Sequence, residues 1–373
     1  MSAGIEIQLI AVVVAVACSL PGVFLVLRKM SMMTDAITHT ILLGIVIAFF
    51  ITNSLTSPFL ILGAALMGVF TVFLTEILNG TRLVSEDSAI GIVFPLLFSI
   101  AIIIISKYAG SVHLDTDSVL LGELAYAPFN RLFLFGRDLG PKAIYSMGTI
   151  LILNLLFIII FFKELKIATF DSALATTLGF MPSLIHYSLM SLVSITAVGA
   201  FESVGSILVI AFMIGPPVTA HLLTDDLRIM ILLSALAGSI NALLGYQIAL
   251  YFDVSIAGSM AVMTGITFLL IFIVAPGKGL FTIVRRRKKQ KFEFAEKTLL
   301  FHIFNHEGKE NEHIELGIDT IQEHVNWDKD FLNIIMANLL SEEKLYVDQG
   351  MLKLTDLGRV FTIKSYEEIV SEF

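Results

Sequence analysis

Residues 28–44 read Arg-Lys-Met-Ser-Met-Met-Thr-Asp-Ala-Ile-Thr-His-Thr-Ile-Leu-Leu-Gly. Asp35 and His39 are four residues apart, so on a helix they lie on one face, one turn from each other. The residues from Thr40 to Ile51 are almost wholly apolar, which predicts that this face leads into a lipid bilayer. An ionised carboxylate near the bilayer centre costs about 2.5–3.5 kcal/mol, so a chain that keeps it there is expected to use it. Because carboxylate oxygen and imidazole nitrogen suit Mn, Fe(II) or Zn, the pair is a candidate metal site.

The spacing of Asp35 and His39 leaves two other interpretations open. Arg28 and Lys29 indicate a membrane boundary nearby, so Asp35 is also placed to cap its helix or to form an internal ion pair with His39. The third interpretation is a proton relay through the same two groups. The spacing alone does not decide among them.

The composition predicts a membrane protein. Hydrophobic residues make up 56% of the 373 residues and the mean hydropathy is +0.88, whereas soluble domains are about 45–50% apolar. Runs long enough to span a bilayer, roughly 20 residues each, are placed at 6–27, 36–52, 58–78, 89–106, 143–162, 183–200, 204–223, 229–250 and 257–275. The first run follows Glu6 and lacks a basic start and a small-residue cleavage site, so we expect a retained span and not a signal peptide.

Nine spans put the N-terminus outside and the C-terminal tail inside, in a multi-pass protein of the cell membrane. The positive-inside rule agrees, because the predicted inner connections are basic. They hold Arg28, Lys29, Arg82, Lys163, Lys166, Arg228 and the cluster 285–289. The long outer segment 107–142 is an exception, and there acidic residues balance the basic ones.

Charge divides the chain into two parts. Residues 291–373 hold 17 acidic and 8 basic residues, a net charge of −9. Since the whole chain holds 32 acidic and 24 basic residues, the first 290 hold 15 and 16. We therefore expect a transmembrane domain over 1–284, and a basic linker with a cytoplasmic domain over 285–373. Cys18 is the one cysteine, so neither a disulfide framework nor a cysteine metal cluster can form.

Several stretches resemble the membrane permease of bacterial ABC importers for manganese, zinc and iron, the ABC-3 metal permease family. They are Met30-Ser31 with Asp35-Ala36-Ile37-Thr38-His39 and Gly44, the turn 86–92, and the long stretches 201–209 and 214–226. The resemblance covers roughly the first 280 residues. It implies an all-α polytopic fold like that of type II ABC importers, and it favours metal binding as the role of Asp35 and His39.

The segment around residues 216–227 is expected to contact the ATPase. Pro216 and Pro217 predict a helix end or kink, because proline lacks the N–H and clashes with the preceding turn. A short helix over 218–224 is then expected before a charged turn. The residues alone leave an ordinary proline-terminated helix with a turn equally open, and the family resemblance makes the segment the coupling helix. The residues expected to couple are Pro216, Pro217, Thr219, Leu223, Asp225 and Asp226. The charged connection 163–175 is the next candidate.

Two outer segments carry further candidate ligands. His113, Asp115 and Asp117 are placed to gather a divalent cation at an entrance, although a solvated loop explains them as well. This loop resembles the manganese-type branch of the family, which favours manganese as cargo. Asp253 is interpreted first as a cap of the following helix and second as an entrance ligand.

The tail resembles a winged helix. Helices are expected near 294–303, 318–325 and 328–341, followed by a hairpin over 345–354 with Gly350 at the turn and Trp327 in the core. The net charge of −9 disfavours DNA, whose affinity for proteins depends on basic phosphate contacts. A protein-contact or regulatory module is expected instead. His302, His306, His313 and His324 are expected to be solvated, and metal binding is the alternative, since 302 and 306 are four residues apart on an expected helix.

The leading hypothesis is the permease subunit of an ATP-driven importer of manganese, zinc or iron, with no permanently bound cofactor. No Gly-x-x-x-x-Gly-Lys-Ser/Thr motif occurs, so ATP hydrolysis is expected in a separate ATPase chain. The resemblance also implies a metal-binding protein outside, a second permease copy or a homologous permease, and surrounding membrane lipid. The alternatives are a secondary metal–proton exchanger that uses Asp35 and His39, and a membrane-tethered transcription regulator.

Overall fold

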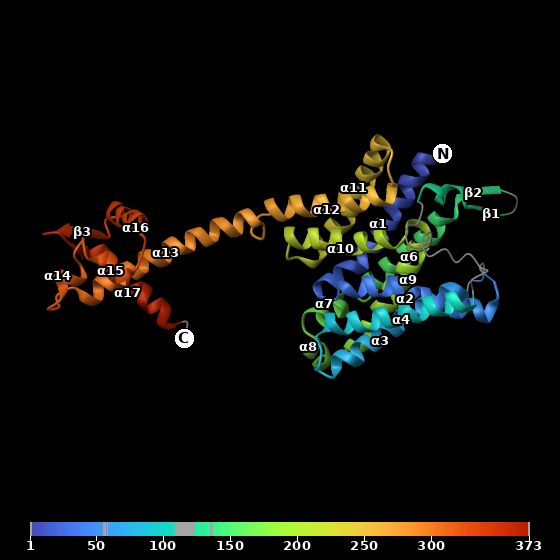
Figure 1. Ribbon diagram of the computed structural model, residues 1–373, viewed down its shortest axis with the longest axis horizontal. Coiled ribbons are helices and arrows are strands. Elements are labelled where there is room, and N and C mark those ends of the chain that lie inside the picture. Colours follow the sequence, from blue (N-terminus) through green and yellow to red (C-terminus); the bar gives the residue numbers. More distant parts are fainter. Residues whose placement is uncertain (1, 55–56, 58, 109–123, 135–136, 372–373) are drawn as a thin grey trace. The chain divides into compact units, whose positions relative to one another are not determined.

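The computed structural model describes residues 2–54, 57, 59–108, 124–134 and 137–371. The chain divides into two compact units, Met1–Gly279 and Leu280–Phe373, which Figure 1 traces from blue to red. Each unit is built around its own apolar core.

The first unit is a bundle of long apolar helices. Among the described residues, nine helices are long and apolar enough to cross a membrane. They are α1 (Ala3–Leu27), α2 (Met32–Thr52), α3 (Phe59–Gly80), α4 (Glu86–Tyr108), α6 (Lys142–Ile160), α9 (Pro182–Val204), α10 (Ser206–Leu223), α11 (Leu227–Phe252) and α12 (Ile256–Val274). Each corresponds to one predicted span, so the predicted polytopic helical fold is confirmed.

Helix α1 lies at the centre of this bundle. It packs against α6, α9, α10 and α11, and its side chains from Ile10 to Leu25 supply much of the core. Helix α2 pairs with α3 and α4 beside it. The outer helices leave large apolar side chains exposed, for example Ile152 and Ile159 of α6. Such a surface is favourable in lipid, where exposed apolar side chains carry no hydration cost.

Contacts between distant segments group the helix ends at two sides of the bundle. At one side, Arg28 after α1 donates from Nε to Thr169 Oγ1 at 3.1 Å, and Lys278 after α12 donates to the His221 carbonyl oxygen at 3.0 Å. We call this side the basic end. At the opposite side, Arg131 Nη1 lies 3.3 Å from Glu6 Oε2.

Short elements complete the first unit. Helices α7 (Phe162–Phe170) and α8 (Ser172–Thr177) follow α6 at the basic end. At the opposite end lie the 3-10 helix η1 (Leu124–Phe129) and a small antiparallel hairpin, β1 (Arg131–Leu134) with β2 (Arg137–Pro141).

Helix α10 corrects one prediction. It runs from Ser206 to Leu223 straight through Pro216 and Pro217, so the separate short helix predicted after the prolines does not form. Proline at 217 leaves the Met213 carbonyl without its helical partner. That oxygen instead faces α1 so closely that a Cβ added to Gly22 would lie 2.1 Å from it. Helix α10 packs against α1, α11 and α12. These contacts keep it continuous at the two prolines, where the rule that proline ends or kinks a helix predicted a break.

The second unit combines helices with one hairpin. Its helices are α13 (Leu280–His306), α14 (Glu312–Glu315), α15 (Ile321–Val325), α16 (Lys329–Ser341) and α17 (Asp356–Ser371). The hairpin pairs β3 (Leu345–Asp348) with β4 (Met351–Leu354). An isolated antiparallel bridge between Gly317 and Met351 pairs a third segment with β4. Trp327 is partly buried and packs against the core of this unit, as predicted. Helix α17 was not predicted from the sequence.

Candidate metal site in the transmembrane unit

Asp35 and His39 meet one turn apart near the start of α2. His39 Nε2 lies 3.4 Å from Asp35 Oδ1, and the two side chains are 23% and 37% exposed. Ligand atoms around a tetrahedral zinc ion lie about 3.4 Å apart, so this separation suits two ligands of one divalent ion. The same separation also suits an ion pair when His39 is protonated.

The surroundings of His39 fix the ring without using both of its nitrogens. The imidazole packs against the rings of Phe94 and Phe98 of α4, at centroid distances of 5.1 and 5.7 Å. Its Nδ1 is buried and has no hydrogen-bond partner. Asp35 does not cap the helix, because Ser31 holds the N-cap position and Asp35 lies inside the first turn. The pair therefore retains ligand capacity that the protein fold does not consume.

A second polar cluster at the basic end was missed by the sequence analysis. Glu76 lies on α3, and its Oε1 is 2.5 Å from His186 Nε2. The Tyr187 hydroxyl donates to the other carboxylate oxygen of Glu76, Oε2. Arg28 Nη1 lies 3.1 Å from His186 Nδ1 and ties the same imidazole to the end of α1. These contacts join α1, α3 and α9. The signal that identifies the cluster is an acidic residue inside an otherwise apolar span, which is rare without a partner.

The predicted outer ligands are placed as follows. His113, Asp115 and Asp117 lie outside the described residues. Asp253 is exposed and ends α11 in the left-handed conformation, with φ 53°. The cap of the next helix is Ser255, whose Oγ accepts from the Gly258 N–H at 3.3 Å, so the capping role predicted for Asp253 is wrong.

Comparison with known proteins places these features in a family. A family model described as "ABC 3 transport family" matches residues 5–275. The chain belongs to the ABC 3 transport family. It is accordingly the membrane permease subunit of an ABC transporter and not an enzyme, and the ATPase is a separate subunit.

Relatives cover nearly the whole ABC 3 region. The zinc transport system membrane protein TroD of Treponema pallidum (strain Nichols) is 46% identical over 325 residues, which cover 86% of this chain and 88% of TroD. The manganese transport system membrane protein MntD of Bacillus subtilis (strain 168) is 47% identical over 271 residues, covering 73% and 92%. The solved structure of PsaBC from Streptococcus pneumoniae in complex with Fab has a TM-score of 0.63 at 29% identity, covering 76% of this chain and 95% of that one.

The residues expected to couple this ABC 3 permease to its ATPase divide into two groups. Pro216, Pro217 and Thr219 are buried inside the bundle. Leu223, Asp225 and Asp226 lie at the basic end, where α10 turns into α11.

The two aspartates of this turn are held by different partners. Lys278 donates to the Asp225 carboxylate and lowers the pKa of Asp225 below its ordinary value. The backbone N–H groups of Ile229 and Arg228 donate to Asp226 Oδ1 and lower the pKa of Asp226. The exposed turn is therefore held in a fixed shape.

Proposed function

We propose that this chain is the permease of an ATP-driven importer whose cargo is Mn²⁺ or Zn²⁺, and that Asp35 and His39 lie on the path of the ion. The observation that carries the proposal is the 3.4 Å pairing of a carboxylate with an imidazole whose other nitrogen is unpartnered. TroD, named for zinc, and MntD, named for manganese, support both ions almost equally by identity. Oxygen and nitrogen ligands accept either ion.

Two ligands do not fill the coordination shell of a divalent ion, which takes four or more. A second permease copy, or a homologous permease, would supply a second aspartate–histidine pair to the same ion. A metal-binding protein outside would deliver the ion, and ATP-driven closure of the ATPases inside would switch access across the membrane.

The ATPase is proposed to dock at the basic end, on a surface that combines α7, α8 and the turn 224–226. The coupling role is thus assigned to exposed residues of α7, α8 and the turn 224–226, and not to the buried Pro216 and Pro217. Phe170, Leu174 and Leu178 are 60%, 48% and 56% exposed. Leu165 of α7 packs with Ala220 and Leu227 in one apolar cluster, so α7 and the turn form one surface.

The second unit is proposed to be a cytoplasmic winged helix that contacts protein rather than DNA. Four helices, α13 to α16, followed by a hairpin, with a strand bridge at Gly317, support the comparison. Asp328 and Asp330 are exposed at the start of α16, where a DNA-reading helix would need basic residues. The basic cluster 285–289 in α13 supports a cytoplasmic location.

The test is metal uptake by cells or vesicles that hold the permease with its ATPase. Asp35→Ala and His39→Ala should abolish uptake of Mn²⁺ and Zn²⁺, while membrane insertion and ATPase binding remain as in wild type. The matched controls are Asp319→Ala and His313→Ala, an exposed acid and an exposed histidine of the second unit. Wild-type uptake in both Asp35→Ala and His39→Ala would remove the pair from the ion path.

The same vesicles separate the importer from the metal–proton exchanger. Uptake should require internal ATP and the ATPase subunit. Uptake driven by a pH gradient in vesicles without ATPase would instead establish the exchanger. Competition between Mn²⁺, Zn²⁺ and Fe²⁺ identifies the preferred cargo.

A further inference from the structure

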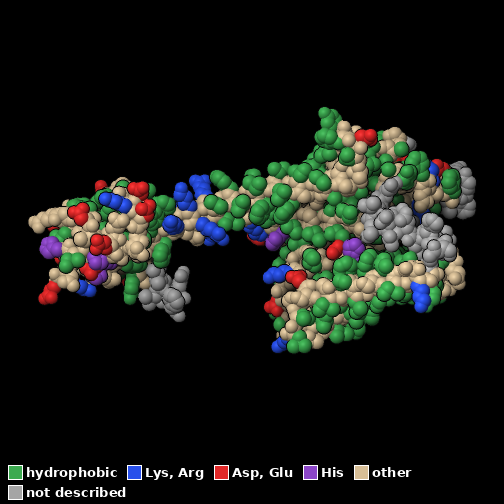
Figure 2. Space-filling view, in the orientation of Figure 1, with side chains coloured by type: hydrophobic (Ala, Val, Ile, Leu, Met, Phe, Trp, Pro, Cys, Tyr) green, Lys and Arg blue, Asp and Glu red, His purple; other side chains and the backbone are tan. Residues whose placement is uncertain are grey.

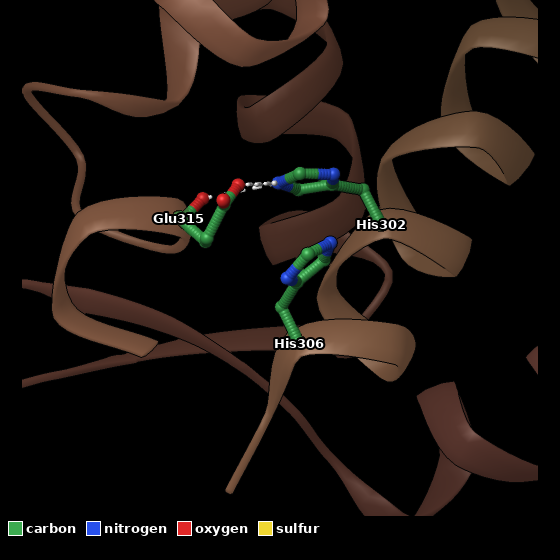
Figure 3. Close-up of side chains that lie close together, drawn as sticks. All are labelled: His302, His306 and Glu315. Atoms are coloured by element: carbon green, nitrogen blue, oxygen red, sulfur yellow. Dashed lines mark hydrogen bonds and ion pairs between the residues drawn. The ribbon is translucent and has the colours of Figure 1, made fainter. Parts of the chain in front are cut away.

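Three side chains of the second unit turn toward one another where α13 ends and α14 follows. They are His302, His306 and Glu315, drawn in Figure 3. One ligand atom from each lies within 4.8 Å of the other two, and all three side chains are partly buried. Of the two interpretations of these histidines, the partial burial of His302 and His306 favours metal binding over solvation, whereas His313 is exposed.

The cluster is held by contacts between three helices. His302 and His306 lie one turn apart on α13, with ring centroids 4.6 Å apart. His302 Nε2 is 3.1 Å from the Glu315 carbonyl oxygen and 3.6 Å from its Oε2. His324 of α15 adds a third imidazole, whose Nδ1 lies 3.2 Å from Glu315 Oε2.

Ordinary ion pairing explains this arrangement incompletely. In the described part of the chain, the ion pairs of Glu315 are both made to imidazoles and not to lysine or arginine. Both contacts are made by the one oxygen Oε2, so these pairs use neither the second carboxylate oxygen of Glu315 nor the second nitrogen of each ring. A neutral imidazole offers a free lone pair, and it is the form that binds metal. A divalent cation would satisfy the carboxylate and the lone pairs together.

We propose that His302, His306 and Glu315 form a binding site for one divalent transition-metal ion in the second unit. Two imidazole nitrogens and a carboxylate oxygen are the ligand types of zinc sites, and they also accept Mn²⁺ and Fe²⁺. Ligand atoms around tetrahedral zinc lie about 3.4 Å apart, so small side-chain rotations bring the three groups into range. His324, through its contact with Glu315, is the fourth ligand or orients the carboxylate.

Metal at this place would link the end of α13 to α14 across the turn 307–311. Helix α13 is also the first element of the second unit, directly after α12 and the turn 275–279 in the chain. The role we assign to the site is to sense the imported ion on the inner side and to limit further uptake. This role rests on the proposed function, whereas the binding of the ion does not.

The binding test uses the full chain in detergent, titrated with Zn²⁺ at equilibrium. Every sample carries Asp35→Ala, which removes the transmembrane pair from the count. In this background we expect one Zn²⁺ per chain. His302→Ala should lose it, Glu315→Gln should weaken it more than tenfold, and His313→Ala should leave it unchanged. Equal affinity and stoichiometry in His302→Ala and its background would overturn the proposal.

A second measurement covers variants that fold poorly. Co²⁺ bound by nitrogen and oxygen ligands in a tetrahedral site gives visible absorption bands, so the background protein itself reports the site without a ligand substitution. Absence of these bands in the background protein would also overturn the proposal. His324→Ala should weaken Zn²⁺ binding by about 10–100-fold, the usual effect of removing a group that orients a ligand. Because Asp35→Ala is transport-inactive by expectation, the ion-binding result does not depend on the uptake result.

Discussion

Glu76 and His39 illustrate two different fates of a polar side chain in an apolar helix. Both oxygens of Glu76 have partners, His186 and Tyr187, so its hydrogen-bonding capacity is consumed by the fold. His39 has a buried Nδ1 without a partner and faces Asp35 through its other nitrogen. A buried polar atom without a partner costs about 1–3 kcal/mol. This cost is expected where a ligand supplies the missing interaction. His186 Nε2 in the Glu76 cluster is likewise a buried nitrogen without a hydrogen bond, so the difference between the two places lies in the carboxylates, of which that of Glu76 is already engaged by two side chains.

Gly22 offers a prediction about packing at the scale of one residue. Gly22→Ala would place a methyl group 2.1 Å from the Met213 carbonyl oxygen, so α1 and α10 would have to separate. Overpacking of this kind costs about 1–3 kcal/mol. Thermal melting in detergent should show a lower midpoint. The control is Gly265→Ala in α12, where nothing lies within 4 Å of the added methyl group.

For Gly22→Ala, a melting midpoint equal to wild type would contradict the close approach of the two helices. Gly265→Ala should melt at or slightly above the wild-type midpoint, because alanine favours helix more than glycine does.

At the scale of elements, the nine spans could be predicted from the sequence because each is an apolar run of about the length that a bilayer requires. The path of α10 could not, because the rule for proline is local and the packing of Gly22 against Met213 joins residues far apart in the chain. The Asp35–His39 pair could be found from its spacing. The unpartnered Nδ1 could not, since it depends on which rings α4 places beside it.

The turn between α10 and α11 predicts a pH dependence. The N–H groups of Ile229 and Arg228 lower the pKa of Asp226 in the folded protein, so its capping contribution is complete above the ordinary aspartate pKa. It is lost as the pH falls through the lowered folded pKa. Asp226→Ala should therefore lower the melting midpoint at neutral pH, and the difference from wild type should shrink below about pH 4.

Asp226→Asn is the matched variant for this test. Asparagine caps helices about as well as aspartate and carries no charge. It should melt near wild type at neutral pH. A difference between wild type and Asp226→Ala that stays constant down to about pH 3 would show that the carboxylate does not stabilise the turn.

The docking surface on α7 and α8 predicts a pattern of cross-links. Cys18 is the native cysteine and is fully buried, so introduced cysteines are the reactive ones. Leu174→Cys, 48% exposed on α8, should cross-link to the assembled ATPase, whereas Thr219→Cys, 2% exposed inside α10, should not. Cross-linking at position 219 without any at position 174 would return the interface to the proline segment.

At the scale of the whole molecule, the match to one relative extends beyond the first unit. The alignment with TroD spans 325 residues, more than the 279 residues of the first unit, so it reaches into the second. The alignment with MntD spans 271 residues, which is fewer than the first unit holds. We therefore expect permease activity to be separable from the second unit, as the proposed regulatory role requires.

Deletion of residues 291–373 tests this separation. The cut retains the basic cluster 285–289 at the start of α13 and removes the second core, which begins at Phe292. We expect the shortened chain to insert, to bind its ATPase and to import metal, because the spans and the α7–α8 surface remain. Uptake measured after preloading cells with the cargo ion should fall in wild type and stay high in the deletion.

His302→Ala in the full chain distinguishes regulation by metal binding from a general effect of removing 83 residues. If metal at His302, His306 and Glu315 limits uptake, this single substitution should reproduce the deletion in preloaded cells, and His313→Ala should behave as wild type. A deletion that fails to insert would show that the second unit is needed for assembly and contradict its regulatory role. Sequence-specific DNA binding by the full chain would contradict it as well, because the acidic surface around Asp328 and Asp330 should repel phosphate at moderate salt.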